Sequence, residues 1–125
     1  PIMRDEMLDV FLDFVQDERH SILLSSHITS DLEKIADYIT FIHNGRLIFS
    51  ALKDELRYNY AVMRCSENQF QALNQEDMMA YLKRDYQVDV LLSDGKAAQR
   101  KYKDAVIDHV SIEEIMLLLI KGERV

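Results

Sequence analysis

The sequence is poor in cysteine, proline, glycine and tryptophan, and these scarcities exclude several classes of protein. Its 125 residues contain one cysteine, one proline, three glycines and no tryptophan. The lone Cys65 excludes an intramolecular disulfide and a zinc site built on cysteines, and the three scattered glycines exclude a glycine-rich loop around a phosphate. Basic residues are also outnumbered by acidic ones: the sequence has 15 Lys and Arg and 22 Asp and Glu, which gives a net charge of -7. Nucleic acid, whose phosphates attract clustered basic side chains, is therefore not an expected ligand.

Long hydrophobic runs are absent as well. No apolar stretch approaches the roughly 20 residues of a membrane-spanning helix, and the start of the chain has no signal-peptide layout. These absences predict a cytoplasmic protein, and a hydrophobic fraction of 48% predicts a sizeable core. Pro1 leads directly into a helical pattern without an initiator methionine, which we interpret as a chain cut from a longer one.

The first 26 residues predict a helix followed by a buried strand. Apolar residues recur at spacings of three and four over 2–17, the period of an amphipathic helix. The apolar run within 21–26 is typical of a strand that is covered on both faces. A helix followed by a strand is half of a βαβ unit, and the missing parallel strand is a second indication of truncation. Because an open strand edge is a template for pairing, we expect a homodimer or a swapped assembly.

His27 directly follows this expected strand. Ligands of open α/β folds bind at the carboxyl ends of strands, so His27 is a candidate functional residue, with a purely structural histidine as the alternative. A helix from about 31 to 36 follows, with Ser30-x-x-Glu33 as its capping box. Ser26 and His27 do not form a nucleophile–base pair, because neighbours on a strand point to opposite faces. No local metal motif joins the histidines, although a site could still assemble in space from His20, His27, His43 and His109.

Two β-rich runs, at 38–43 and 46–51, flank Asn44-Gly45. Both turn residues tolerate positive φ, so this pattern strongly predicts a β-hairpin. A short helix over 51–58 is expected to lead away from it.

The pattern changes near Tyr58, where we place the boundary between a region 1–57 and a region 58–125. The basic residues Arg100, Lys101 and Lys103 favour a solvated surface over an anion site, and the apolar final helix favours a core position over a docking patch. The expected elements of the second region are strands at 60–65, 88–92 and 106–110, a helix capped by Ser66, a helix over 76–86, a turn at 93–96, a helical or looped basic segment at 97–104, and a final helix after the capping box Ser111-x-x-Glu114.

The order of strand, histidine, helix and Asn-Gly hairpin, continuing into Arg46-Leu47-Ile48, resembles the switch-histidine region of ABC transporter ATPases. Pro1 matches the end of that family's D-loop, and Arg4 matches an arginine in the helix that follows it. This resemblance covers about residues 1–57. Residues 58–125 resemble the C-terminal extension of ATPases that serve exporters of the ABC-2 type.

The resemblance implies a fold and a mechanism. The fold would be α/β, a partial P-loop NTPase domain with an appended C-terminal α+β subdomain. In the family, ATP and Mg²⁺ are held between two nucleotide-binding domains, and the switch histidine contacts the γ-phosphate. His27 matches that role, and Pro1 would belong to the loop that crosses to the partner domain. The intact subunit would couple ATP hydrolysis to transport, in the export direction, with a transmembrane permease at the cytoplasmic face of the membrane.

The departures from the family matter equally. Its phosphate loop, glutamine loop, signature sequence, Walker B aspartate and catalytic glutamate would all precede Pro1, and none is in this sequence. We therefore expect this chain alone neither to bind ATP tightly nor to hydrolyse it. The alternative, from a different class, is a free-standing α+β regulatory or interaction module without nucleotide chemistry.

Overall fold

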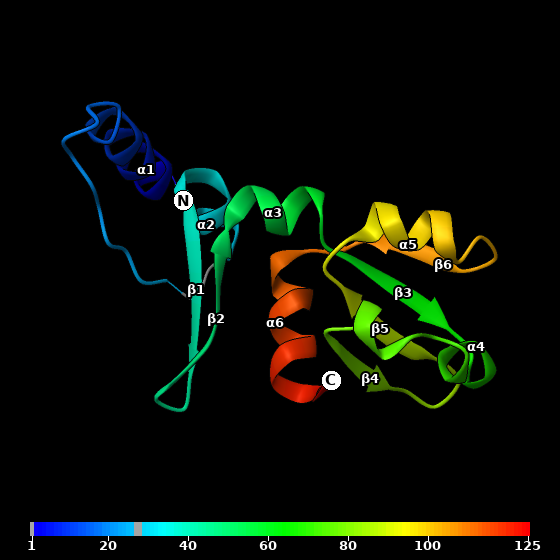
Figure 1. Ribbon diagram of the computed structural model, residues 1–125. Helices are drawn as coiled ribbons and strands as arrows, with labels where there is room; N and C mark the ends of the chain where they lie inside the picture. The colour runs from blue at the N-terminus through cyan, green and yellow to red at the C-terminus, as the bar shows by residue number, and fades with distance from the viewer. Residues whose placement is uncertain (1, 27–28) are drawn as a thin grey trace.

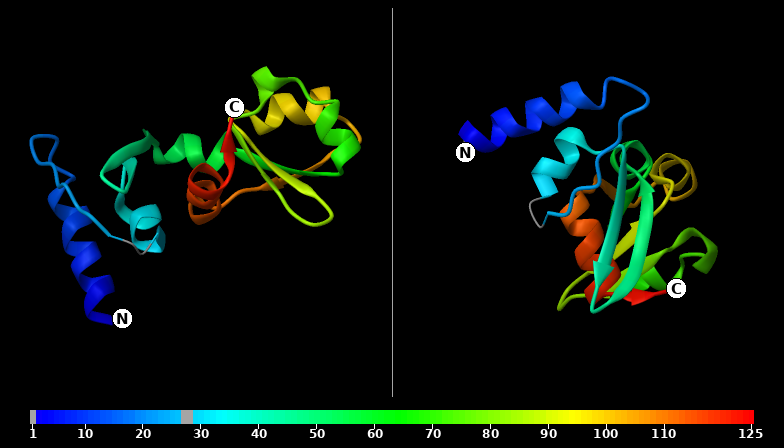
Figure 2. Two further views of the ribbon diagram at one scale, coloured as in Figure 1. Left: turned by 90° about the horizontal axis from the view of Figure 1, so that it is seen from below. Right: turned by 90° about the vertical axis from the view of Figure 1, so that its left-hand side faces the viewer.

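The computed structural model describes residues 2–26 and 29–125, which form a mixed α/β fold with two antiparallel sheets (Figure 1). This mixed fold agrees with the α/β fold class expected from the sequence. Figure 2 shows an elongated molecule in which the first helix and the larger sheet lie at opposite ends. The elements of the first part are α1 (Ile2–Phe14), α2 (Thr29–Ile35), β1 (Tyr38–His43), β2 (Arg46–Leu52) and α3 (Lys53–Tyr58). Those of the second part are β3 (Ala61–Cys65), α4 (Glu67–Gln71), the 3₁₀ helix η1 (Gln75–Asp77), β4 (Ala80–Lys83), β5 (Val88–Leu92), α5 (Gly95–Lys101), β6 (Val106–His109), α6 (Ile112–Lys121) and β7 (Glu123–Arg124).

The predicted buried strand at 21–26 is wrong for this structure. The segment has no regular secondary structure and joins neither sheet. Its apolar residues are exposed, and the side chain of Leu23 is fully so. The reason is physical: a strand is stabilised by the ladder it shares with a neighbour, and no described strand pairs with this segment.

The two helices of the first part differ from expectation at their ends. Helix α1 stops at Phe14 rather than near residue 17, and its last turn has no basic side chain to complement the helix dipole. Helix α2 starts at Thr29, so Ser30 lies inside its first turn and the predicted capping role of Ser30 is wrong.

The predicted hairpin is confirmed. Strands β1 and β2 pair antiparallel around Asn44 and Gly45, whose φ angles are 51° and 73°. Both angles lie in the left-handed region that a tight type I′ turn requires. One face of the hairpin is covered, because Ile39 and Phe41 are buried. The predicted short helix after the hairpin is also confirmed as α3.

The second part is built on a five-stranded antiparallel sheet with strand order β6-β3-β5-β4-β7. Strands β3 to β6, with α4 and α5, follow the order βαββαβ, and their spatial order is that of the split βαβ, or ferredoxin-like, arrangement. Helices α4 and α5 cover one face of this sheet and α6 covers the other. The predicted strands at 60–65, 88–92 and 106–110 are thus confirmed within one or two residues.

The predicted helix over 76–86 is wrong. The chain forms η1 and then β4, which pairs with β5 on one side and β7 on the other. Met79, Tyr81 and Leu82 fit a helical period, but ladder partners on both sides decide the conformation. Strand propensity is set largely by such neighbours rather than by the local sequence.

Two of the predicted helix caps are confirmed, and the turn at 93–96 proves to be a third. At α4 the box is reciprocal, because Ser66 Oγ accepts from the Gln69 amide and Gln69 Oε1 accepts from the Ser66 amide. At α6 Ser111 Oγ accepts from the Glu114 amide, whereas the Glu114 side chain binds Arg64 instead of completing a capping box. The Asp94 side chain caps α5 by accepting from the Ala97 amide at 3.0 Å. These bonds satisfy donors that a helix start leaves free.

Alternate residues along the strands of the larger sheet lie in two separate hydrophobic cores, one on each face. Met63 and Val90 point toward α4 and α5, whereas Val62 and Leu91 point toward α6. The α6 side of the core also includes the buried hairpin face and Leu56 of α3. Helix α6 therefore packs the hairpin and the larger sheet into one apolar cluster (Figure 1).

Candidate functional site

His27 and Pro1, the two site residues predicted from the sequence, lie outside the described residues. What the structure does show is the frame on either side of them. Helix α2, which begins two residues after His27, is packed on the core through Leu32, and Ala36, the residue directly after the helix, packs there as well. The helix is tied to α1 by an ion pair of 3.3 Å between Arg4 Nε and Asp31 Oδ1, and Asp31 is buried. Helix α2 is therefore anchored from two directions.

The other three histidines do not come together. The His20 ring stacks on Phe14 at 4.3 Å, and its Nδ1 lies 3.1 Å from the Phe14 carbonyl oxygen. His43 ends β1 opposite Arg46, and His109 ends β6 at the far edge of the larger sheet. Within residues 2–26 and 29–125, no three His, Cys, Asp or Glu side chains form a group that could hold a metal ion.

The basic residues near position 100 do not gather around an open anion site. Lys101 Nζ lies 2.8 Å from Asp77 Oδ2, and Tyr102 donates to the same carboxylate. The hydrogen bond to Asp77 raises the pKa of Lys101, and the bonds from Lys101 and Tyr102 lower the pKa of Asp77. Lys101 thus joins α5 to η1, and Arg100 and Lys103 are exposed. This arrangement agrees with the solvated surface that the sequence favoured.

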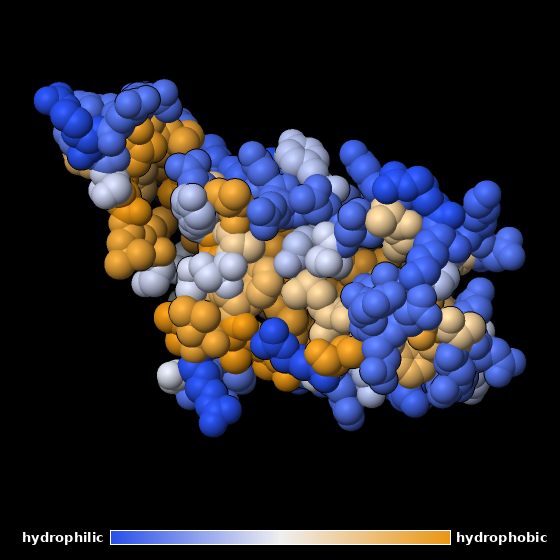
Figure 3. Space-filling view, in the orientation of Figure 1, coloured by the Kyte–Doolittle hydropathy of each residue, from blue (hydrophilic) through white to orange (hydrophobic). Residues whose placement is uncertain are grey.

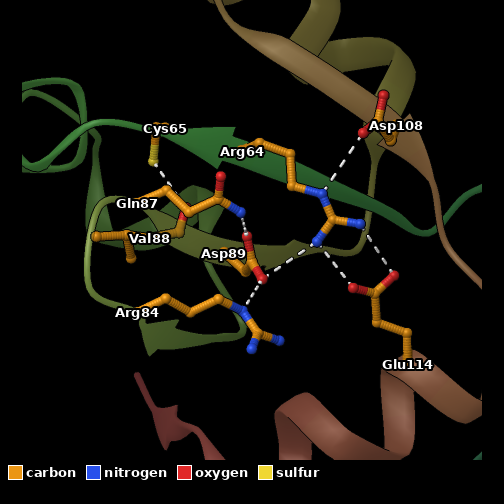
Figure 4. Close-up of polar contacts among 8 residues, drawn as sticks. All are labelled: Arg64, Cys65, Arg84, Gln87, Val88, Asp89, Asp108 and Glu114. Atoms are coloured by element: carbon orange, nitrogen blue, oxygen red, sulfur yellow. Dashed lines mark hydrogen bonds and ion pairs between the residues drawn. The ribbon is translucent and has the colours of Figure 1, made fainter.

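The most concentrated charge in the described residues is a network around Arg64 that sequence reasoning missed (Figure 4). Arg64 of β3 makes two hydrogen bonds to Glu114 of α6, at 2.8 and 3.2 Å. It also lies 3.2 Å from Asp89 of β5 and 3.5 Å from Asp108 of β6. One arginine therefore links three strands of the sheet to the first turn of the helix that covers them.

Asp89 is the buried member of this Arg64 network. Its side chain is 1% exposed, and its two oxygens accept hydrogen bonds from Arg84 at 2.6 Å and from Gln87 at 2.7 Å. Burial acts to raise the pKa of Asp89, but these two bonds and the charge of Arg64 outweigh it, so the pKa is lowered. The hydrogen bond that Arg64 donates to Glu114 raises the pKa of Arg64, against the opposing effect of burial. Asp89 is therefore ionised at neutral pH.

The Arg64 network is structural rather than catalytic. Buried charges need partners, and every described buried side-chain nitrogen or oxygen has a hydrogen-bond partner. Of the network, only Asp108 lines either of the two surface hollows that are described below. One sequence signal could have revealed it: Arg64 and Asp89 are single charged residues inside otherwise apolar strands, and charges there are seldom tolerated unpaired.

The remaining reactive group is not accessible. Cys65 is buried and its Sγ donates to the Val88 carbonyl oxygen at 3.4 Å. Burial, with the charges of Asp89 and Glu67, raises the pKa of the Cys65 thiol to about 11. A thiol in this state is not a nucleophile at neutral pH.

Two shallow hollows lie on the second part of the chain. The one of about 280 Å³ lies where β4, β7 and α6 meet, beside Lys83 and Lys121. The one of about 170 Å³ lies between β3, α5 and β6, beside Lys96 and His109. Both are open and mixed in polarity, unlike the enclosed and largely apolar pockets that bind small molecules. Neither adjoins α2. Across the described part of the chain, no helix combines the length and the apolar character needed to cross a membrane.

Comparison with known proteins gives a partial similarity. The chain is 32% identical over 47 residues to the thiamine import ATP-binding protein ThiQ of Chelativorans sp. (strain BNC1). The match covers 38% of this chain and 19% of that protein, so the chain spans about a fifth of the length of the relative. This similarity supports a relationship to ABC-type nucleotide-binding proteins, and it does not support the exporter subtype. No family model matches the chain, and no solved structure does.

Proposed function

We propose that this chain is part of the ATP-binding subunit of an ABC transporter, and that His27 is the switch histidine of that subunit. The observation that carries the proposal is the 47-residue similarity to an ATP-binding protein of this type. It is supported by the elements that follow position 27: a helix, then an Asn-Gly hairpin, as the family resemblance requires.

His27 has the chemistry that this role needs. An imidazole N–H donates a hydrogen bond to a phosphate oxygen and stabilises the negative charge that develops during phosphoryl transfer. Because histidine titrates near neutral pH, this contact would make turnover depend on pH. ATP and Mg²⁺ would be held mainly by a phosphate loop, a Walker B aspartate and a catalytic glutamate, none of which is among these 125 residues.

The packing of α2 supports a positioning role for the frame around His27. Leu32, with Ala36 directly after the helix, packs α2 on the same apolar cluster that includes the hairpin and α6. The ion pair between Arg4 and Asp31 holds α1 against α2. A histidine that must meet a phosphate within hydrogen-bond distance needs a rigid support of this kind.

The partners and direction of transport belong to the same proposal. Pro1 would lie in the loop facing a second nucleotide-binding domain. A transmembrane permease at the cytoplasmic face of the membrane would be coupled to ATP binding and hydrolysis. The relative with the 47-residue match is described as a thiamine import protein. We nevertheless propose export for this chain, because residues 58–125 resemble the extension of ABC-2 exporters. Substrate accumulation in inverted membrane vesicles tests this direction, and ATP-driven uptake into whole cells would contradict it.

The central test compares ATP hydrolysis by the complete reading-frame product with that of its histidine variants. We expect His27→Ala to lower the turnover number by about 100-fold, the usual effect of removing one donor to a transition-state anion. His43→Ala, at an exposed position on the hairpin, is the matched control and should leave turnover within about twofold of the wild type. The 125-residue chain alone should show no turnover. Turnover by the isolated chain that His27→Ala abolishes would contradict the proposal.

A second function is favoured by one specific observation. The βαββαβ arrangement of β3 to β6 has apolar residues buried on both faces of its sheet, as expected of a self-contained regulatory or interaction module. Fold alone does not assign function. The two proposals differ in the encoding reading frame: the transporter proposal requires a phosphate loop and a signature sequence upstream of Pro1, and the module proposal does not.

A further inference from the structure

Helix α6 of the second part packs against the first part of the chain. Its inward side chains Ile112, Ile115, Leu118 and Leu119 are buried, and none is more than 4% exposed. They share one apolar cluster with the covered face of the hairpin and with Leu56 of α3. Hydrophobic atoms gather where the hairpin meets α6, and mostly hydrophilic atoms cover the outer end of the second part (Figure 3). Since both sides of this contact belong to the chain, no other segment is needed to form it.

Helix α2, which begins two residues after His27, also lies against α6. Leu32 of α2, and Ala36 directly after the helix, pack on the cluster that contains α6. On the side of α1, Asp31 forms its ion pair with Arg4. Helix α2 has only seven residues, and a helix of that length is held by its packing rather than by its own hydrogen bonds. Helix α6 therefore supplies part of the support of α2.

Helix α6 is itself fixed to the larger sheet and to the hairpin. In its first turn, Glu114 accepts two hydrogen bonds from Arg64 of β3. Directly after the helix, Arg124 of β7 donates to the carbonyl oxygen of Ile48 in β2 at 3.2 Å. Packed interiors are nearly incompressible and transmit strain. A shift of the larger sheet therefore moves α6, and with it the surface on which α2 rests.

We propose that α6 positions the switch-histidine segment, so that the second part of the chain regulates ATP hydrolysis through α2. This inference rests on the proposed function of His27. Leu32 is the positioning residue at the contact, because it joins α2 to the α6 cluster. Phosphoryl transfer is sensitive to such support, since misplacing a reacting group by about 1 Å costs about 100-fold in rate.

Single-turnover cleavage of ATP by the complete subunit, with ATP affinity measured on the same samples, tests the role of Leu32. We expect Leu32→Ala to slow cleavage about tenfold and to leave ATP affinity within about twofold, because alanine keeps the helix but removes its contact with the cluster. Leu32→Met, which nearly conserves volume, should restore most of the rate. Leu73→Ala is the matched control, because Leu73 is also half-buried but packs in the core on the other face of the sheet. It should leave cleavage within about twofold of the wild type.

Hydrogen exchange of the 125-residue chain tests the link between α6 and α2 without nucleotide. Val62 of β3 and Val90 of β5 are both fully buried, but Val62 belongs to the α6 cluster and Val90 to the core on the other face. The cavity left by Val62→Ala should loosen α6 and speed the exchange of α2 amides at least about threefold relative to Val90→Ala. The two variants carry the same change at the same burial, so the difference isolates the face that α6 covers.

Two results would overturn the inference. They are cleavage by Leu32→Ala as fast as by Leu73→Ala, and α2 amides that respond equally to Val62→Ala and Val90→Ala. Far-UV circular dichroism checks that each variant is folded, and if Leu32→Ala does not fold, the hydrogen-exchange comparison decides. His27→Ala separates this inference from the proposed function. Wild-type cleavage by His27→Ala would remove both, whereas slow cleavage by His27→Ala with unchanged cleavage by Leu32→Ala would remove only the role of α6.

Discussion

The replacement Asp89→Asn probes the Arg64 network at its buried centre. The Asp89 carboxylate accepts from Arg84 and Gln87 and faces Arg64 at 3.2 Å, and its side chain is 1% exposed. Asparagine keeps the shape but offers one acceptor oxygen in place of two. Its amide group must therefore point at a donor, and the two guanidinium groups lose the negative charge between them.

The expected cost follows from this geometry. Removing one partner of a buried ion pair costs roughly 3–5 kcal/mol, and leaving a buried donor unsatisfied costs roughly 1–3 kcal/mol. Arg84 is 45% exposed and can turn to water, and Arg64 keeps Glu114. We therefore expect the free energy of unfolding to fall by about 2–3 kcal/mol, equivalent to a decrease in Tm of roughly 8 °C for a domain of this size.

Urea unfolding followed by circular dichroism measures this change. Asp104→Asn, at an exposed position, is the matched control and should change the free energy of unfolding by less than about 0.5 kcal/mol. A loss below about 0.5 kcal/mol for Asp89→Asn, equal to that of the control, would refute the account of the Arg64 network.

The same pair of proteins has a defined pH dependence. Because the pKa of Asp89 is lowered on folding, its stabilising contribution is present above the unfolded value of about 3.9 and is lost as the pH falls through the folded pKa. The stability difference between wild type and Asp89→Asn should be constant from about pH 5 to pH 8 and should shrink below about pH 4. A difference that stays constant down to about pH 2 would contradict the assigned ionisation.

Two further variants test packing and capping. A Cβ added at Gly95 would lie 2.6 Å from the Ala61 Cβ, so Gly95→Ala should push α5 away from β3. Thermal unfolding should then show a free energy of unfolding that is lower by about 1–3 kcal/mol. Lys96→Ala, at the neighbouring exposed position, is the control and should leave this free energy nearly unchanged. Ser111 Oγ accepts a hydrogen bond from the Glu114 amide at 3.1 Å, so Ser111→Ala should lower the free energy of unfolding by about 1 kcal/mol. Ser111→Asp should restore most of that loss, because aspartate also caps helices. Equal stability of Ser111→Ala and the wild type would show that this cap does not stabilise α6.

The parts of the fold that could be predicted from the sequence are those fixed by local chemistry. The Asn44-Gly45 turn needs positive φ at two successive residues, and few sequences supply it. The caps at Ser66 and Ser111 lie within four residues of the amides that they satisfy. These elements depend little on the rest of the chain, so their patterns were sufficient.

The parts that could not be predicted depend on distant neighbours. The segment 21–26 reads as a strand, but it has no ladder partner among the described residues, and 80–83 reads as a helix but lies between two strands. The Arg64 network depends on the register that sets Arg64 opposite Asp89, which neither strand reveals alone. For the candidate site, His27 was identified by its place after an apolar run and before a hairpin, and it lies outside the described residues.

One measurement tests the role of His27 most directly. It is the single-turnover cleavage of ATP by the complete subunit, with ATP binding measured on the same samples. If His27 stabilises the transferred phosphoryl group, His27→Ala should slow cleavage by about 100-fold while ATP affinity changes by less than about threefold. Cleavage at the wild-type rate by His27→Ala, with His43→Ala as the control, would show that this histidine does not contact the reacting phosphate.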